Sequence, residues 1–262
     1  MPAFVSALTL TVLMGQNPAQ AAAPPLDTSC PQLAVALRGV ISNDARLRDW
    51  PQLARYRDSN RELAASAPGE SRVVFMGDSI TDLWQQPRFG GFFPGKPYLD
   101  RGISGQTTPQ MLIRFRPDVI ELSPKVVVIL AGTNDIAGNT GPVTNEDIER
   151  NIESMAELAK THGIKVVLSS IMPTSAYHTQ PNGTPQTTSR PLDRIKAINT
   201  WMKGYAERNG HVYLDYFSAM VDATGVMKAE LTADDLHPTI DGYKIMAPLA
   251  EAAIQKALAG SR

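Results

Sequence analysis

The stretch RVVFMGDSITDLW, residues 72–84, sets the fold and raises the question of function. Its apolar half ends at Gly77, and Asp78 and Ser79 then open a segment that can turn helical. A short apolar run of this kind is typical of a β-strand buried on both faces. Taken alone, Ser79 is more typical of a helix N-cap than of a nucleophile. Its role therefore depends on what the rest of the chain brings to the same place.

Four more apolar runs follow, and polar segments with helical spacing separate them. The runs are PYLDRGI (97–103), KVVVILAG (125–132), KVVLSSIM (165–172) and HVYLDYF (211–217). The helical segments are 108–120, 145–163, 191–210 and the segment after Pro238. Alternating strands and helices predict a parallel sheet covered on both faces. A barrel would need eight such units, whereas this chain supplies five, so we expect an open, doubly wound α/β fold.

Composition and charge argue against nucleic acid as a partner and against a disulfide or a thiolate metal cluster. The 262 residues are enough to bury a sizeable core, and the net charge of -1 gives no reason to expect nucleic acid as a partner. Cys30 is the only cysteine, so neither an intrachain disulfide nor a thiolate metal cluster is expected. The fractions of apolar and charged residues are those of an ordinary soluble globular protein.

The N-terminal region differs from the rest of the chain. The apolar run at 3–14 is too short to span a bilayer, and small residues suited to cleavage follow it. We therefore expect a signal peptide over 1–23, although it has no basic start, and a secreted or periplasmic protein without stable membrane insertion. Residues 24–70 are expected to form a helical extension, with helical spacing over 31–66, and residues 71–262 the α/β domain.

The residue types that a nucleophilic hydrolase needs follow the predicted strands. Ser79 comes after the first strand, Gly105 after the second and Asn134 after the third, while Asp234 and His237 come after the fifth. In an open parallel sheet, ligands bind beyond the carboxyl ends of the strands. Each residue alone has an ordinary structural explanation as a cap, a turn residue or a solvated loop residue. Their presence together at one edge favours a catalytic site.

His237 is the best candidate for the base that a serine nucleophile requires. Asp234 lies three residues before it and can orient the ring, and Asp235 is a competing orienter. The other histidines are His162, at an expected helix end, His211, at a strand start, and His178, in a long loop with no neighbour expected to orient it. We expect the oxyanion donors to be the N–H groups of Ser79 and Gly105 and the side-chain amide of Asn134.

Asp78 is expected to hold the turn before Ser79 rather than to act as the acid of a triad. No metal site is expected, because no second histidine stands at ligand spacing from Asp234, Asp235 and His237.

Four sequence blocks resemble those of the GDSL, or SGNH, hydrolase family. They are GDSI (77–80), GISGQTT (102–108), GTND (132–135) and DDLHP (234–238), in family order. The resemblance implies a flavodoxin-like, three-layer αβα sandwich with a five-stranded parallel sheet, and ester hydrolysis without a metal or cofactor. Its Asp-x-x-His spacing selects Asp234 over Asp235. Within the family, the layout looks like platelet-activating-factor acetylhydrolase and related lysophospholipase-like bacterial esterases.

The resulting hypothesis is a serine esterase that forms an acyl-enzyme. Its substrates would be small-molecule, glycan or lipid esters with short acyl or acetyl groups, including lysophospholipid or acetylated carbohydrate. The alternative is a non-catalytic module that binds a nucleotide, flavin or carbohydrate on a flavodoxin-like sheet, but neither Gly-x-Gly-x-x-Gly nor Gly-x-x-x-x-Gly-Lys is present. Trp84, Phe92 and Phe93 are candidates for an acyl pocket or for plain core, and the loop at 173–190 is a candidate lid.

Overall fold

The computed structural model describes residues 47–63, 69–181 and 183–260, together with residues 35, 37–40, 65 and 67. The signal peptide expected over 1–23 and the thiol of Cys30 lie outside the described residues. The chain divides into two compact units, residues 1–45 and residues 46–262. In the first unit, residues 35 and 37–40 are helical. The second unit contains the sheet and every candidate site residue.

The second unit is built on a five-stranded parallel sheet with the strand order β2-β1-β3-β4-β5. The strands are β1 (Val73–Gly77), β2 (Tyr98–Gly102), β3 (Val126–Ile129), β4 (Lys165–Ser169) and β5 (Val212–Leu214). This order is the flavodoxin-like one, in which the direction of strand addition reverses after β2: β2 lies on one side of β1, and β3, β4 and β5 follow on the other. All five expected strands and the open α/β architecture are confirmed.

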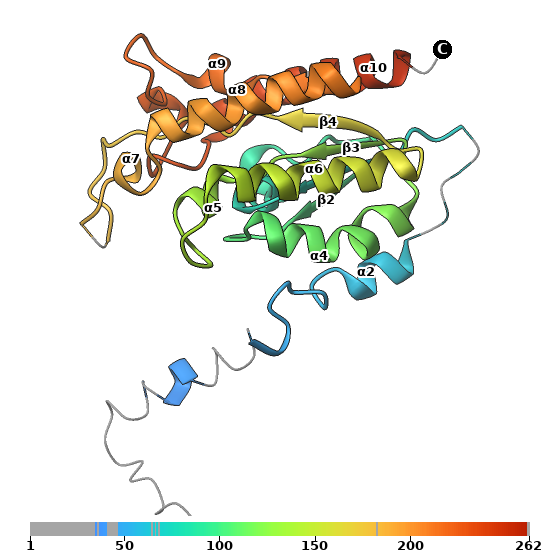
Figure 1. Cartoon of the computed structure of the whole chain (residues 1–262), viewed down its shortest axis with the longest axis horizontal. Coiled ribbons are helices and arrows are strands. Elements are labelled where there is room, and N and C mark those ends of the chain that lie inside the picture. Colours follow the sequence, from blue (N-terminus) through green and yellow to red (C-terminus); the bar gives the residue numbers. More distant parts are fainter. Residues whose placement is uncertain are drawn as a thin grey trace, which may run out of the picture. The chain divides into compact units, whose positions relative to one another are not determined.

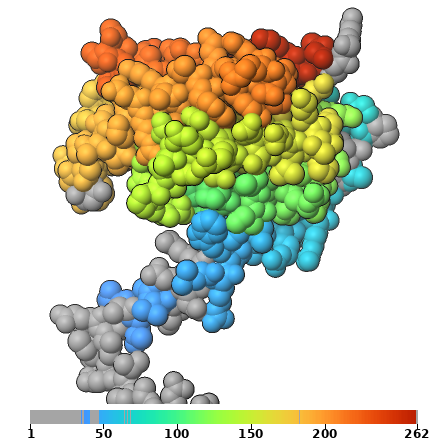
Figure 2. All heavy atoms as spheres, in the orientation of Figure 1, coloured from blue at the N-terminus to red at the C-terminus, as the bar shows by residue number. Residues whose placement is uncertain are grey.

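Helices cover the sheet on both faces, as Figure 1 shows for α4, α6 and α8 on one side. The helices of eight residues or more are α4 (Thr108–Asp118), α6 (Asn145–Thr161), α8 (Leu192–Asn209) and α10 (Ile240–Ala259). Shorter helices are α2 (Arg57–Glu62), α3 (Ser79–Asp82), α5 (Thr133–Ile136), α7 (Gln186–Ser189) and α9 (Tyr216–Met220). In the space-filling view of Figure 2, α4, α6 and α8 form one continuous surface.

Two apolar clusters hold these layers together, and β1 contributes to both because successive side chains point to opposite faces. Val74 and Met76 pack in the cluster beneath α4, α6 and α8, whereas Val73 and Phe75 pack in the cluster beneath α10. All five residues of β1 are buried. A strand of this kind reads as a continuous apolar run, which is why residues 72–76 predicted it.

The helix expected over 31–66 is wrong as a continuous element. Among the described residues of this segment only short helical pieces occur, and residues 49–56 form turns before α2. The carboxylate of Asp49 accepts hydrogen bonds from the backbone N–H groups of Leu53 (2.8 Å) and Ala54 (2.9 Å), and Gln52 has a positive φ of 56°. Pro51 also disfavours helix at the residue before it. The turns bring this segment against the sheet, where the Tyr56 hydroxyl donates to the carbonyl of Gly102.

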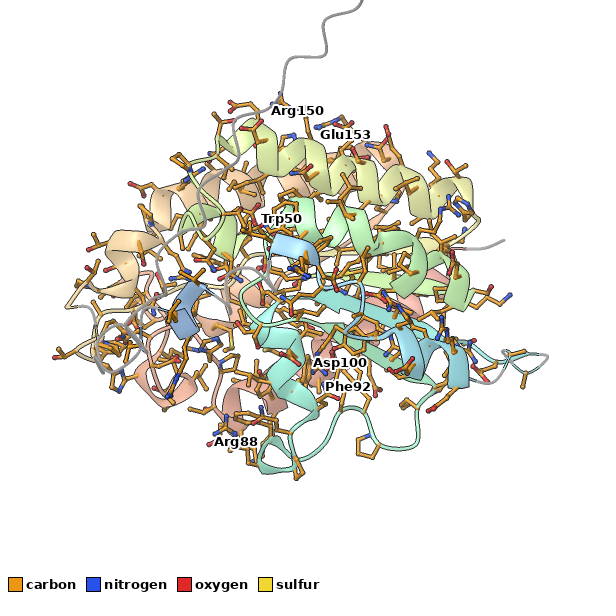
Figure 3. All side chains as sticks on the ribbon, turned by 90° about the horizontal axis from the view of Figure 1, so that it is seen from below. Trp50, Arg88, Phe92, Asp100, Arg150 and Glu153 are labelled. Atoms are coloured by element: carbon orange, nitrogen blue, oxygen red, sulfur yellow. The ribbon has the colours of Figure 1, made fainter. Side chains whose placement is uncertain are left out.

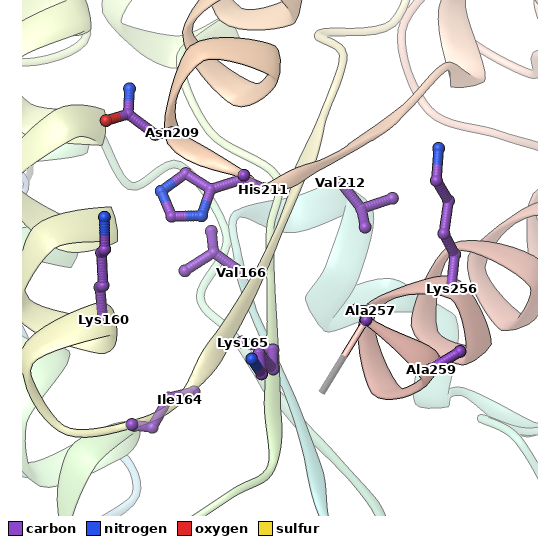
Figure 4. A pocket seen from close by; sticks show the side chains of 13 residues that line it. Lys160, Ile164, Lys165, Val166, Asn209, His211, Val212, Lys256, Ala257 and Ala259 are labelled. Atoms are coloured by element: carbon purple, nitrogen blue, oxygen red, sulfur yellow. The ribbon is translucent and has the colours of Figure 1, made fainter. Parts of the chain in front are cut away.

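A cavity of about 720 Å³ opens at the amino ends of β4 and β5 (Figure 4). Its lining includes Lys160, Lys165, His211 and Lys256, and burial together with the charge of Lys160 lowers the pKa of His211. None of the predicted site residues lines it. The candidate site follows the carboxyl ends of the strands, at the opposite edge of the sheet.

Candidate active site

The turn that carries Ser79 is shaped by Asp78. Asp78 is the N-cap of α3, and its Oδ1 atom accepts a hydrogen bond from the N–H of Ile80 at 2.9 Å. The carboxyl is fully buried, and this burial raises its pKa to about 6 although the Ile80 N–H and the nearby charge of His237 act in the opposite direction. Its Oδ2 atom has no hydrogen-bond partner within the described part of the chain. Ser79 follows at the first position of α3 and is 8% exposed.

The loop after β2 lies against α3 because Gly102 leaves room for it. A Cβ atom on Gly102 would lie 2.2 Å from the backbone nitrogen of Asp82, so no side chain fits there. The Asp82 carboxylate then accepts hydrogen bonds from the backbone N–H (3.1 Å) and the hydroxyl (2.6 Å) of Ser104. This close packing sets the second sequence block, and with it Gly105, against the turn that carries Ser79.

Ser79, His237 and Asp234 form a continuous hydrogen-bonded chain. The Oγ atom of Ser79 is 2.8 Å from Nε2 of His237, and Nδ1 of His237 is 2.6 Å from Oδ2 of Asp234. Oδ1 of Asp234 also accepts from the backbone N–H of His237 at 2.7 Å. Partial burial of Asp234 opposes its charge, but the side-chain and backbone hydrogen bonds from His237 outweigh it and lower its pKa to about 2. The carboxylate facing the imidazole is thus ionised at neutral pH.

Asp235 points away from His237 and into the long loop. Its φ of 70° turns the backbone, and its buried carboxylate accepts from the hydroxyl of Ser175 (2.6 Å) and the N–H groups of Tyr177 (2.9 Å) and His178 (2.8 Å). These hydrogen bonds outweigh the effect of desolvation and lower the pKa of Asp235. The expectation that nothing orients His178 is wrong, because its Nδ1 atom is 3.2 Å from Oδ1 of Asp235. Sequence patterns cannot reveal this contact, which joins residues 57 positions apart.

The loops after β2 and β3 meet through Gly105 and Asn134. Gly105 has a φ of 82°, a conformation that favours glycine, and its carbonyl accepts from Nδ2 of Asn139 at 3.0 Å. Asn134, in α5, is 3% exposed and donates from Nδ2 to the carbonyl of Gln106 at 3.0 Å. The N–H of Gly105 has no hydrogen-bond acceptor among residues 69–181 and 183–260. The Ser79 N–H, at the first position of α3, has no acceptor within that helix.

Asp135, the last residue of the third block, joins the same two loops. Its carboxylate accepts from the backbone N–H of Thr108 at 3.0 Å and from the Thr108 hydroxyl at 2.6 Å, at the start of α4. Burial raises its pKa, and the bonds from Thr108 partly offset this effect. Asp135 therefore holds the start of α4 against α5, the helix that carries Asn134.

Two buried arginines that the sequence analysis did not identify also contact these loops. Arg114, on α4, donates to the carbonyl of Gly77 (3.0 Å) and to Oε1 of Gln106 (2.5 Å), and it pairs with Asp118 at 3.1 Å. Its spacing from Asp118 on a predicted helix is a signal that the sequence offers. Arg190, at the end of the long loop, donates to Oδ1 of Asn134 at 3.3 Å, and no local pattern indicates that contact.

The three candidate aromatic residues belong to the apolar core beneath α10. Trp84 and Phe93 are 4% and 7% exposed, and both pack against Phe75 of β1 with ring centroids 6.3 and 5.1 Å away. Phe92, on the segment between α3 and β2 (Figure 3), is partly buried against the same ring. Trp84 also packs on Tyr243, whose hydroxyl donates to the carbonyl of Ile80 at 2.8 Å. These rings form part of the core against which α3 packs.

The arrangement provides a serine hydroxyl, an imidazole that can accept its proton, and a carboxylate that holds the imidazole. Neutral N–H donors of the two neighbouring loops lie at the same edge of the sheet. In the part of the chain that the structure describes, no group of three or more His, Cys, Asp or Glu side chains is placed to hold a metal ion. None of the described helices has the length and apolarity to cross a bilayer.

Several known proteins are similar to this chain in sequence or in fold. A GDSL-like lipase from Bacteroides thetaiotaomicron is 41% identical, with a TM-score of 0.72, and the match covers 79% of this chain and 98% of that chain. Platelet-activating factor acetylhydrolase IB subunit alpha1 of Rattus norvegicus is 25% identical over 87% of this chain and 85% of that protein. The lipoprotein YqeF of Bacillus subtilis is 37% identical over 78 residues, which are 29% of this chain and 32% of the lipoprotein.

The sequence model of the GDSL-like lipase/acylhydrolase family matches residues 75–245, which contain all four sequence blocks. The family resemblance seen in the sequence is thereby confirmed. The chain belongs to the GDSL-like lipase/acylhydrolase family and is by class a carboxylic ester hydrolase.

Proposed function

We propose that Ser79, His237 and Asp234 are a catalytic triad that hydrolyses carboxylic esters through an acyl-enzyme. The observation that carries the proposal is the hydrogen-bonded chain from Ser79 Oγ to His237 Nε2 (2.8 Å) and from His237 Nδ1 to Asp234 Oδ2 (2.6 Å). A serine hydroxyl is a weak nucleophile until a base accepts its proton, and an oriented imidazole is suited to that task.

The reaction proceeds in two halves. Ser79 Oγ attacks the carbonyl carbon while His237 Nε2 accepts its proton, and Asp234 stabilises the imidazolium that forms. The oxyanion is stabilised by the N–H groups of Ser79 and Gly105 and by the amide of Asn134. His237 then donates the proton to the leaving alcohol. In the second half, His237 removes a proton from water, which attacks the acyl carbon. The bond between the acyl carbon and Ser79 Oγ then breaks, His237 returns the proton to Oγ, and the carboxylic acid is released.

For the acyl group we propose acetyl or another short chain, on a small-molecule, glycan or lipid alcohol. The name of the rat relative, an acetylhydrolase, supports this choice. The packing of Trp84 and Phe93 in the core also supports it, because these rings are buried against Phe75 and are not free to line a pocket for a long acyl chain. Similarity to part of a bacterial lipoprotein supports an extracytoplasmic location.

The test is hydrolysis of p-nitrophenyl esters with acyl chains from acetate to octanoate. We expect the highest kcat/KM for the shortest chains, and the Ser79→Ala variant to lose at least about 10³-fold in kcat while it stays folded. Full activity of that variant would sink the assignment.

The two neighbouring carboxylates provide a matched pair of variants. Asp234→Asn removes the charge that faces His237, so kcat should fall by roughly 10³- to 10⁴-fold. Asp235→Asn alters only the anchor of the loop and should retain far more activity. If the two variants were equally impaired, the choice of Asp234 as triad acid would be wrong.

A further inference from the structure

The side chain of Asn134 is held at both ends of its carboxamide. Nδ2 donates to the carbonyl of Gln106 at 3.0 Å, and Oδ1 accepts from Nη2 of Arg190 at 3.3 Å. A carboxamide is nearly symmetric in shape, so sterics alone would allow it to rotate by 180° about its last bond. A backbone carbonyl only accepts and a guanidinium only donates, so a single orientation satisfies both partners. In that orientation the second N–H of Nδ2 remains available to an oxyanion.

Arg190 is itself fixed in place. Its Nε atom donates to the hydroxyl of Thr133 at 3.2 Å, and its Nη1 atom donates to the Gln186 side chain in α7. The residue is 7% exposed. It ends the loop at 173–190, and its carbonyl accepts from the hydroxyl of Thr174 at the start of that loop, at 3.3 Å.

The charge on Arg190 is supported by carboxylates of the candidate site. Burial lowers the pKa of its guanidinium, whereas the nearby charges of Asp78 and Asp234 raise it. Arginine remains protonated in proteins, so this group acts only as a donor at any working pH. The guanidinium of Arg190 can therefore only donate a hydrogen bond to the Asn134 carboxamide and cannot accept one from it.

We propose that Arg190 is a positioning residue for ester hydrolysis, which fixes the Asn134 carboxamide with its N–H toward the oxyanion. The inference rests on the proposed function. Without Arg190, the rotated amide would present its oxygen to the developing negative charge, and the site would lose one oxyanion donor for part of the time. Loss of a whole donor typically lowers kcat by about 10²- to 10³-fold, so we expect a loss of about 10- to 100-fold.

A double-mutant cycle with Asn134→Ala and Arg190→Met, measured with p-nitrophenyl acetate, tests this role. In the wild-type background, Arg190→Met should lower kcat by about 10- to 100-fold and change KM by less than about two-fold, because its effect falls on the transition state. In the Asn134→Ala background, the same substitution should change kcat by less than about three-fold, since the side chain it positions is gone. Independent, multiplying losses would overturn the proposal, as would a loss seen mainly in KM.

Arg194→Met is the matched control. Arg194 lies in the first turn of α8 and donates to Asn145 Oδ1 at 2.7 Å and to the carbonyl of Val143. It also donates to the carbonyl of Ile136, at the end of α5, at 3.4 Å, but to no atom of Asn134. We expect its kcat to stay near that of the wild type. If Arg190→Met does not fold, Arg190→Lys replaces it, with an intermediate kcat expected in the wild-type background and almost no further loss in the Asn134→Ala background.

The outcomes also separate this inference from the proposed function. An active Ser79→Ala variant would refute the triad itself. An inactive Ser79→Ala variant together with additive losses for Arg190 and Asn134 would leave the triad intact and refute the positioning role alone.

Discussion

Replacement of Asp78 by asparagine should make the protein's stability less sensitive to pH. Asparagine keeps an oxygen that can accept from the N–H of Ile80, so the N-cap of α3 remains. It removes a carboxyl that is fully buried and whose Oδ2 atom lacks a hydrogen-bond partner among the described residues. An ionised carboxylate at this position is therefore unfavourable in the folded protein.

The magnitude follows from the pKa of Asp78, which burial raises from 3.8 to about 6. Between these two values the folded state holds a proton on Asp78 that the unfolded chain has lost. The wild-type protein thus loses stability as pH rises from about 4 to about 6, and the loss stays constant above that range. Each pKa unit corresponds to about 1.4 kcal/mol, so the loss amounts to about 3 kcal/mol.

Equilibrium urea unfolding of both proteins between pH 4 and pH 7.5, followed by circular dichroism, measures this effect. The free energy of unfolding of Asp78→Asn minus that of the wild type should increase by about 2.5 kcal/mol from pH 4 to pH 7, because Asp78 in the unfolded chain is already partly ionised at pH 4. A fixed cost of burying the new amide shifts both ends of the curve equally and does not affect this difference. Asp58→Asn, which removes a carboxylate that is 86% exposed, should show a much smaller pH dependence. A difference that stays constant within about 0.5 kcal/mol for Asp78→Asn would refute the reasoning, since the expected change is several times larger.

Three further predictions concern the surroundings of the site. Gly102→Ala should lower the free energy of unfolding by about 2–3 kcal/mol in urea and reduce kcat, because its Cβ would lie 2.2 Å from the Asp82 nitrogen; unchanged unfolding would contradict this packing. Asp235→Ala should speed chymotryptic cleavage after Tyr177 while cleavage elsewhere is unaffected, because three donors of the loop lose their acceptor. Prolonged dialysis against EDTA should leave ester hydrolysis unchanged, and an activity that disappears and then returns with added Zn²⁺ would point to a metal enzyme instead.

Local sequence patterns were sufficient to predict the sheet and the residues at its edge. The strands β1, β3, β4 and β5 are short, mostly apolar runs, whereas β2 includes the buried Asp100 and Arg101. The side chains of β1 alternate between two buried clusters, so its burial can be read from composition alone. Ser79, Gly105, Asn134, Asp234 and His237 became candidates because each lies in a short block that comes after a strand along the chain. In a parallel sheet, residues that directly follow the strands gather at the carboxyl ends of those strands, so their place in the sequence predicts their place in the fold.

The contacts that lock the site in place were not predictable in the same way. Arg190 contacts Asn134 across 56 residues, and Asp235 contacts His178 across 57, so both depend on how an irregular loop folds back. The expected long helix before residue 66 failed for a local reason, since the carboxylate of Asp49 competes for the N–H groups that a helix would use.

Asp234 and Asp235 stand side by side in the chain, yet their carboxylates serve opposite sides of the backbone because of the left-handed conformation of Asp235. Asp234 holds His237, whereas Asp235 holds the long loop, so the loop can be altered without changing the carboxylate that contacts the imidazole. A loop of different length or composition can be grafted between Gln180 and Gln186, because the hydrogen bonds of Tyr177 and His178 to Asp235 lie outside it. The hydrogen bond from Arg190 to Gln186 also stays in place. The hydrogen bonds that join Ser79, His237 and Asp234 lie outside this segment, so they would keep their geometry. Libraries restricted to residues 181–185 therefore test whether this loop affects substrate preference while those hydrogen bonds are kept.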